Sequence, residues 1–236
     1  MSIFNDISAI QNIIYIFSSI LFISGIKMLG KEDTAVKGNF LSAMAMFIAV
    51  SVTLINVVNP IIVIIGIAIG AIIGSLIALK VKMTSIPEMV ALFNGFGGLA
   101  TFFIAWSEFN AMPDNLFQYV LIMLTTYIGG VTFSGSIIAY GKLSEKLKIQ
   151  KDSIITKLFT TLFYLSILFL VYSTAFTSFI EIPIDFYKVL LILTLLGGIG
   201  FVLPIGGGDM PVVISLLNSF SGIAAAFAGL LLLNNV

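Results

Sequence analysis

The charged residues of this chain are separated by long intervals that contain no charge at all. The seven intervals are 20, 42, 19, 27, 23, 20 and 27 residues long and cover 7–26, 38–79, 89–107, 115–141, 158–180, 189–208 and 210–236. A helix needs about 20 apolar residues to cross the roughly 30 Å hydrocarbon core of a bilayer. Six intervals therefore suit one crossing each, whereas the 42-residue interval is about twice as long as one crossing needs. Since proline cannot continue a helix interior, we expect the chain to fold back at Asn59-Pro60.

These intervals predict an all-α integral membrane protein, a bundle of eight transmembrane helices forming a single transmembrane domain over residues 1–236. The composition agrees, because 59% of residues are apolar and 9% are charged, whereas a soluble domain carries about 25% charged residues. The expected spans lie near 9–28, 39–57, 61–79, 88–106, 118–140, 157–173, 187–205 and 211–233.

The lysines predict the orientation of this bundle. Ten of the eleven flank the first, third and fifth connections, and Lys188 alone lies on the other side. Because cytoplasmic loops carry an excess of positive charge, these connections are expected in the cytoplasm and the N-terminus outside. The outer helix ends then carry the aromatic residues expected at an interface, namely Trp106, Tyr119, Tyr172 and Tyr187.

Several function classes are excluded by what the sequence lacks. A net charge of zero offers no electrostatic footprint for nucleic acid. With no Cys and no His, the usual metal ligands, thiolate nucleophile and neutral-pH proton shuttle are missing. We therefore expect no catalytic, metal-binding or cofactor-binding residue in this chain. The stretch Gly95–Ala100 matches a dinucleotide-binding pattern, but it lies inside an expected span, where glycines favour close helix packing.

Small and polar residues fall at helical spacing on three of the expected spans. This pattern predicts that the spans near 88–106, 118–140 and 211–233 build the interior. The polar residues that are candidates for a transport path are Asn94, Thr132, Ser136, Ser215 and Asn218. For any single Ser or Thr, a hydrogen bond between helices is the alternative interpretation.

The two asparagines occur in segments that repeat at an offset of 124 residues. Aligning 87–100 with 211–224 gives six identities in fourteen positions, and in each copy Asn lies seven residues after a proline. A parallel repeat is one way to build a transport path at a repeat interface. Chance similarity between two helices rich in small residues is the alternative.

One short cytoplasmic turn combines a flexible backbone with a single carboxylate. Gly206, Gly207 and Gly208 precede Asp209 and the start of the last expected span. The acid is compatible with a simple helix start, where negative charge is favourable. The same turn also offers unhindered backbone and one carboxylate to a cytoplasmic partner.

Three stretches resemble the β subunit of the proton-translocating NAD(P) transhydrogenase family. The first is Val-Lys-Met-Thr at 81–84 with Ile-Pro-Glu-Met-Val-Ala at 86–91. The second is Gly-Val-Thr-Phe-Ser-Gly-Ser-Ile-Ile-Ala-Tyr-Gly-Lys-Leu at 130–143. The third is Gly-Gly-Asp-Met-Pro-Val-Val at 207–213, followed by Ser215, the run 217–219 and the pair 221–222. They lie in the family's order, and the similarity extends over nearly the whole chain.

The resemblance implies the membrane sector of the β subunit, which conducts protons coupled to hydride transfer between NADH and NADP. In that family the nucleotides bind soluble domains, so this chain is expected to bind no cofactor itself. The implied partners are an α subunit with its NAD-binding domain, an NADP-binding domain, a second copy of the complete complex and the lipid bilayer. The implied location is the bacterial cytoplasmic (inner) membrane. The chain resembles a β subunit without its last helix and NADP-binding domain, so alone it is not expected to be catalytically competent.

The resemblance also implies roles for individual residues. Asn218 corresponds to an Asn of the family's proton path, and Asn94 to a position that is often His. Asp209, with Gly207 and Gly208, corresponds to the loop that faces the NADP-binding domain. A carboxamide donates and accepts hydrogen bonds but does not hold a proton near neutral pH. The expected mechanism is therefore a water chain gated by helix movement.

Two alternative functions remain open from the sequence. One is an ion-coupled secondary transporter built on the parallel four-helix repeat. Charge-free spans argue against coupled transport of a charged solute, because such paths usually carry intramembrane acids or bases. The other is a scaffold subunit without any path.

Overall fold

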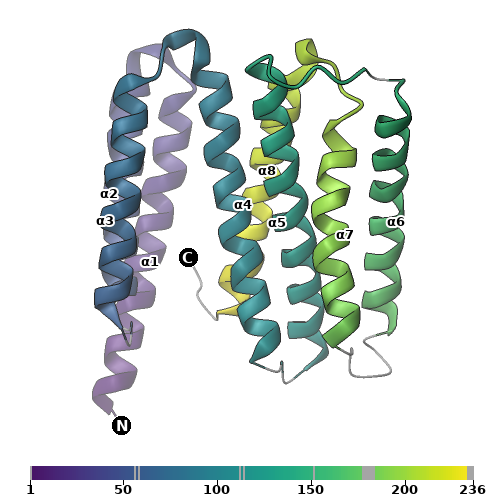
Figure 1. The fold of residues 1–236 in the computed structure, drawn as a ribbon. Helices are drawn as coiled ribbons and strands as arrows, with labels where there is room; N and C mark the ends of the chain where they lie inside the picture. Colours follow the sequence, from purple (N-terminus) through teal and green to yellow (C-terminus); the bar gives the residue numbers. More distant parts are fainter. Residues whose placement is uncertain are drawn as a thin grey trace. The chain divides into compact units, whose positions relative to one another are not determined.

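The structure is a computed structural model that describes residues 2–55, 57, 59–111, 113, 115–150, 152–176 and 184–232, with side chains from residue 9 onward except that of residue 176. All regular structure in these ranges is helical (Figure 1). The long helices are α1 (Ser2–Leu29), α2 (Glu32–Leu54), α3 (Pro60–Lys80), α4 (Ile86–Asn110), α5 (Leu116–Leu143), α6 (Ile154–Phe176), α7 (Ile184–Val202) and α8 (Met210–Leu231). Two 3₁₀ turns, η1 (Met83–Ser85) and η2 (Gly207–Asp209), precede α4 and α8.

The prediction of an all-α membrane protein with eight spans is confirmed. Eight helices of the described ranges are long and apolar enough to cross a membrane. The fold-back at Asn59-Pro60 is also confirmed, since α2 ends at Leu54 and α3 begins at Pro60. The side on which the N-terminus lies remains a prediction.

Contacts divide the described residues into two compact units, one up to residue 80 and the other from residue 81 to residue 232. In the first unit, α1 packs against α2 where Gly25 faces Gly38. A Cβ on Gly38 would lie 2.7 Å from the Gly25 carbonyl oxygen, so the two backbones touch. A hydrogen bond of 3.0 Å joins the Tyr15 and Thr53 hydroxyls. The expectation of one domain over 1–236 remains a prediction.

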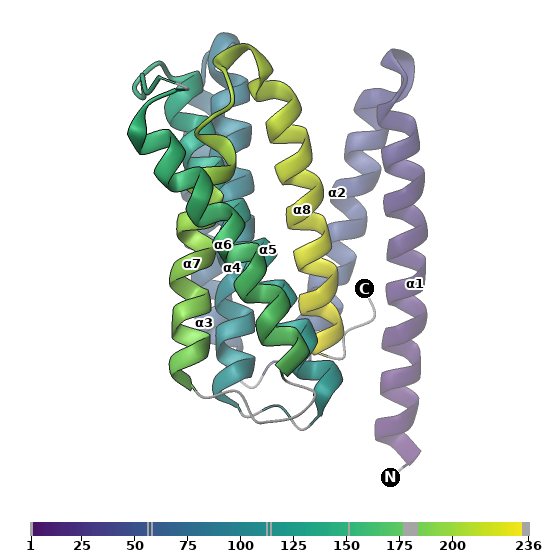
Figure 2. The same cartoon turned by 90° about the vertical axis from the view of Figure 1, so that its right-hand side faces the viewer.

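The second unit is organised around α5. This helix contacts α4, α6, α7 and α8, and α7 lies between α5 and α6 (Figure 1). Figure 2 shows the α5–α6 and α7–α8 connections at the same end of the unit. The sequence predicted α4, α5 and α8 as the interior helices. In the structure α7 also packs against α5, because its glycines permit a close approach. A Cβ on Gly198 would collide with the Ser134 hydroxyl oxygen and the Val131 carbonyl oxygen on α5.

Apolar clusters occupy both ends of this unit. Near the α4–α5 connection the buried cluster includes Phe109, Leu121, Ile122, Tyr187 and Leu190. At the other end it includes Ala91, Ala139, Val202, Met210 and Leu217. Tyr187 was expected at an interface, but it is 1% exposed, because its ring stacks on Phe109 at 3.8 Å and its hydroxyl bonds to that of Thr126 at 2.7 Å.

Candidate functional site

The candidate site lies where glycines bring α4 and α5 into backbone contact. A Cβ on Gly98 would lie 2.8 Å from the Gly129 carbonyl oxygen, and a Cβ on Gly129 would lie 2.8 Å from the Gly98 carbonyl oxygen. A Cβ on Gly95 would likewise lie 3.0 Å from the Cβ of Ser136. This confirms the helix-packing interpretation for Gly95 and Gly98, whereas a Cβ on Gly97 would have no atom within 4 Å. The short separation also lets a medium-sized side chain on α4 reach α5.

Asn94 links three helices through its side-chain amide. Asn94 Nδ2 donates to Ser136 Oγ on α5 at 3.0 Å, and Ser221 Oγ on α8 donates to Asn94 Oδ1 at 2.7 Å. Asn94 is 9% exposed and Ser136 is fully buried. An amide has two N–H donors and an oxygen with two lone pairs. One donor and one lone pair of Asn94 therefore remain after these two bonds.

Thr132 lies one helical turn before Ser136 and is also fully buried. Its hydroxyl oxygen has no hydrogen-bond partner among the described residues. The hydroxyl of Thr125, by contrast, donates to the Leu121 carbonyl oxygen at 2.7 Å, which is the usual solution for a threonine inside a helix. A buried hydroxyl without a partner is costly, so the Thr132 side chain is suited to hydrogen-bond a water molecule.

Ser221 has two acceptors within reach of one hydroxyl hydrogen. Besides Asn94 Oδ1, its oxygen lies 2.8 Å from the Asn218 carbonyl oxygen. Both acceptors lack a hydrogen of their own, so the Ser221 hydrogen is shared or alternates between them. Rotation of this hydroxyl would release Asn94 from α8 without any backbone movement.

The structure does not bring the two asparagine side chains together. Asn218 and Ser215 are exposed on α8, whereas Asn94 is buried between helices. Local structure nevertheless repeats at the predicted offset, because η1 and η2 precede α4 and α8 at positions separated by 124 residues. Both helices also carry proline in the first turn. The two copies thus share a helix start and differ in what covers their asparagines.

The polar cluster of Asn94, Thr132, Ser136 and Ser221 lies between the two apolar clusters. On α4 it is flanked by Ala91 on one side and Phe109 on the other, and on α5 by Ile122 and Ala139. Apolar packing therefore separates this cluster from both ends of the unit.

The predicted coupling turn forms η2 between α7 and α8. Gly207 and Gly208 are exposed, and a Cβ on either would have no atom within 4 Å. Asp209 N donates to the Gly206 carbonyl oxygen at 3.2 Å, and the Asp209 side chain caps no helix N–H. Asp209 is exposed, and in the described part of the chain its carboxylate has no ion-pair partner.

Metal chemistry has no ligand set within the described ranges. No group of three or more His, Cys, Asp or Glu side chains is found there. The buried polar groups are amides and hydroxyls, which order water and donate or accept hydrogen bonds.

Two residues of this region were not predicted as site residues. Ser221 completes the cluster around Asn94, and the repeat gives no indication of it because the matching position is Gly97. Lys142 was counted only for topology, yet its ammonium group holds the start of the α7–α8 connection. Its position in the last turn of α5 is the signal that could have identified it, because a lysine near a helix C-terminus can bond to free carbonyl groups.

These features define an integral membrane protein with a buried polar cluster between apolar layers and an acidic glycine turn at one end. The sequence matches the family described as NAD(P) transhydrogenase beta subunit over residues 11–236. Two proteins of Rhodospirillum rubrum, both named NAD(P) transhydrogenase subunit beta, are 35% identical to it over 236 residues, covering 93% of this chain. The chain belongs to the NAD(P) transhydrogenase beta subunit family. It spans 49% of the length of these two relatives.

Proposed function

We propose that this chain is the proton-conducting membrane sector of a transhydrogenase, coupled to hydride transfer between NADH and NADP on partner domains. The observation that carries this proposal is the hydrogen-bonded contact of Asn94 with Ser136 and Ser221 across α4, α5 and α8. It is a polar centre inside an apolar bundle, in a chain that belongs to the transhydrogenase family.

In this proposal, protons pass along ordered water that is hydrogen-bonded by Asn94, Thr132 and Ser136. The remaining donor and lone pair of Asn94 and the free hydroxyl of Thr132 are the groups that hold the water. Because the apolar clusters separate this centre from both ends, conduction requires a change in packing. In this proposal, rotation of the Ser221 hydroxyl and movement of α8 provide this change in packing.

Ser215 and Asn218 belong to the proposed path as its outer wall. Their face of α8 is exposed, so the proposal requires that a further helix of the complete complex covers it. The proposed partners are an α subunit with an NAD-binding domain and an NADP-binding domain, in a dimer of the complete complex. NAD(H) and NADP(H) bind these domains, and the proposed location is the bacterial cytoplasmic membrane.

The path is tested by Asn94→Leu and Asn218→Leu in a complete complex in inverted vesicles. Each change removes the amide and fills its space, so proton pumping should be lost while hydride transfer between bound nucleotides continues. Asn94→His should retain pumping, because imidazole also forms hydrogen bonds.

Asn110→Leu is the matched control for these variants. Asn110 is exposed at the end of α4, and its Nδ2 donates to the Trp106 carbonyl oxygen of its own helix at 2.9 Å. Intact pumping in both Asn94→Leu and Asn218→Leu would show that the asparagines are packing residues. Loss in Asn94→Leu alone would place Asn218 outside the path.

The coupling turn is tested separately by Asp209→Asn in the same complex. If Asp209 faces the NADP-binding domain, the change should alter NADP(H) affinity or release more than NAD(H) affinity. Asp185→Asn is the control, since Asp185 is exposed at the other end of the unit and pairs with Lys188 at 3.1 Å. Equal effects of Asp209→Asn on both nucleotides would reduce Asp209 to a residue of the helix start.

A further inference from the structure

The connection from α7 to α8 begins with backbone carbonyl groups that its own helix leaves free. The last four carbonyl groups of an α-helix have no intrahelical partner. Here α7 ends at Val202, and Pro204 follows two residues later, so the chain leaves the helix at once. The Val202 carbonyl oxygen accepts from Ile205 N at 3.1 Å, whereas the carbonyl oxygens of Leu203 and Ile205 have no backbone donor among the described residues.

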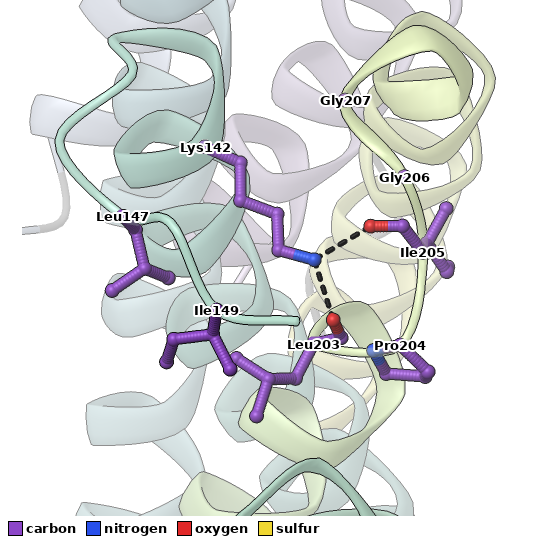
Figure 3. Close-up of a pocket in the computed structure, with 8 residues that line it drawn as sticks. All are labelled: Lys142, Leu147, Ile149, Leu203, Pro204, Ile205, Gly206 and Gly207. Atoms are coloured by element: carbon purple, nitrogen blue, oxygen red, sulfur yellow. Dashed lines mark hydrogen bonds between the residues drawn. The ribbon is translucent and has the colours of Figure 1, made fainter. Parts of the chain in front are cut away.

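Lys142, on the last turn of α5, supplies donors to these carbonyl groups. Its Nζ donates to the carbonyl oxygens of Val202 at 3.3 Å, of Leu203, and of Ile205 at 2.6 Å. Figure 3 shows the ammonium group between the Leu203 and Ile205 carbonyls. A lysine ammonium has three N–H donors and no acceptor, so these three carbonyl oxygens engage all of its donors. Its positive charge also faces the negative end of the α7 dipole.

The surroundings of Lys142 keep this contact in one geometry. After α5 the chain turns back at Glu145, whose φ is 55°, and Leu147 N donates to the Gly141 carbonyl oxygen at 2.9 Å. This return places Leu147 and Ile149 beside the lysine stem. They line a cavity of about 160 Å³ together with Lys142 and residues 203–207 (Figure 3). Charge-assisted bonds that are partly shielded from water are the stronger ones.

Beyond Ile205 the connection has little to hold it. A Cβ on Gly207 or Gly208 would have no atom within 4 Å, and η2 is closed by two local backbone bonds, from Asp209 N to the Gly206 carbonyl oxygen at 3.2 Å and from Met210 N to the Gly207 carbonyl oxygen. Met210, at the start of α8, is fully buried. Asp209 is therefore located by the buried Met210 on one side and by the Lys142 contact on the other.

We propose that Lys142 is a positioning residue that anchors the α7–α8 connection to α5 and thereby determines where Asp209 is presented. Ser136 lies six residues earlier on α5, about 9 Å along a continuous helix. One rigid helix thus joins the buried polar cluster to the acidic turn. The role of this link in coupling rests on the proposed function, whereas the anchor itself is a statement about the fold.

The anchor is tested by thiol labelling of the full chain in membranes. The sequence contains no Cys, so Gly208→Cys provides the only thiol, and a Cβ fits there without any contact. Adding Lys142→Met keeps the apolar stem and removes the ammonium. The rate of labelling by a water-soluble maleimide should rise about tenfold, which corresponds to about 1.4 kcal/mol of lost restraint. Lys142→Arg should restore most of the slow rate, because guanidinium also donates to carbonyl groups.

Two controls separate release of this connection from general unfolding. Lys146→Met removes a nearby exposed lysine that contacts Tyr140, through a 3.4 Å hydrogen bond to its hydroxyl and a 5.4 Å approach to its ring, and it should leave the rate unchanged. A reporter at Ala111→Cys, after α4, should not respond to Lys142→Met. A rate at position 208 within twofold of the parent would overturn the anchor, and so would an equal rise at both reporters.

The coupling role is tested in a complete complex by comparing proton pumping with hydride transfer. Lys142→Met should lose pumping while hydride transfer between bound nucleotides persists, and Lys142→Arg should regain pumping. A released turn with unchanged pumping would overturn the coupling role and leave the anchor standing. Loss of pumping in Asn94→Leu together with intact pumping in Lys142→Met would retain the proposed path and reject this link.

Discussion

At the scale of the residue, hydrogen bonds between helices replace charge as the organising interaction. The charged residues of the predicted spans, Lys27, Glu88, Lys157 and Lys188, lie within two residues of a span end, so the middle of each span carries no charge. Instead, hydroxyl and amide groups join neighbouring helices, as in Tyr127 with Ser166 at 3.1 Å and Thr126 with Tyr187 at 2.7 Å. Such bonds contribute about 0.6 kcal/mol on average inside membranes. Their value here is that they fix which helix faces meet.

Ser221→Ala should therefore destabilise the protein slightly but measurably. The change removes the hydroxyl that joins α8 to Asn94, and we expect a loss of about 0.6–1 kcal/mol in the free energy of unfolding. Ser219→Ala is the matched control, because its exposed hydroxyl donates to the Ser215 carbonyl oxygen of its own helix and reaches no other helix among the described residues. The measurement is reversible unfolding in detergent. Equal stability of the two variants would show that Ser221 does not hold α8 to α4.

At the scale of the element, glycine placement decides which helices pack most closely. On α4, Gly98 touches the Gly129 backbone, whereas a Cβ on the neighbouring Gly97 would have no atom within 4 Å. The two glycines are adjacent in sequence, but Gly98 faces α5 and Gly97 faces open space. This difference gives a direct test of the α4–α5 contact.

Gly98→Ala should separate α4 from α5, while Gly97→Ala should not. The new methyl group at residue 98 would meet backbone oxygen at 2.8 Å, and overpacking of this kind costs about 1–3 kcal/mol. At residue 97 the change should be neutral or stabilising, since alanine is the better helix former. Thermal unfolding in detergent distinguishes the two variants. A Gly98→Ala protein as stable as Gly97→Ala would contradict the close contact.

At the scale of the whole molecule, the ends of the second unit differ in charge. The connection between α5 and α6 carries Lys146 and Lys148, while Lys188 lies near the start of α7 at the opposite end. The positive-inside rule therefore continues to predict a cytoplasmic location for the α5–α6 connection. The same rule predicts the connection between α4 and α5, which contains Asp114, on the outer side. Asp114 lies outside the described residues, so Ala111, directly after α4, serves as the test position.

Single cysteines at Lys148 and Ala111 should report opposite sides of the membrane. In intact cells, an impermeant thiol reagent should label the Ala111→Cys protein and spare the Lys148→Cys protein. Inverted vesicles should show the reverse pattern, which controls for the reactivity of each thiol. Labelling of position 148 from outside would contradict the predicted orientation of the whole chain.

The sequence alone determined the membrane class, the number of helices and most of their ends to within four residues, although α1 and α2 each begin seven residues earlier than predicted. The reason is that bilayer thickness and the cost of burying charge act on each segment separately, as at Asn59-Pro60. The resemblance at 81–91, 130–143 and 207–222 likewise indicated the family before any fold was known.

The tertiary structure decided which polar residues meet. Asn94 and Asn218 share one local pattern, yet only Asn94 is buried, because burial depends on the neighbouring helices and not on the helix itself. The contacts of Asn94 with Ser221 and of Lys142 with Ile205 join residues 127 and 63 positions apart. No local pattern encodes such pairings, since they result from how α4, α5, α7 and α8 pack together.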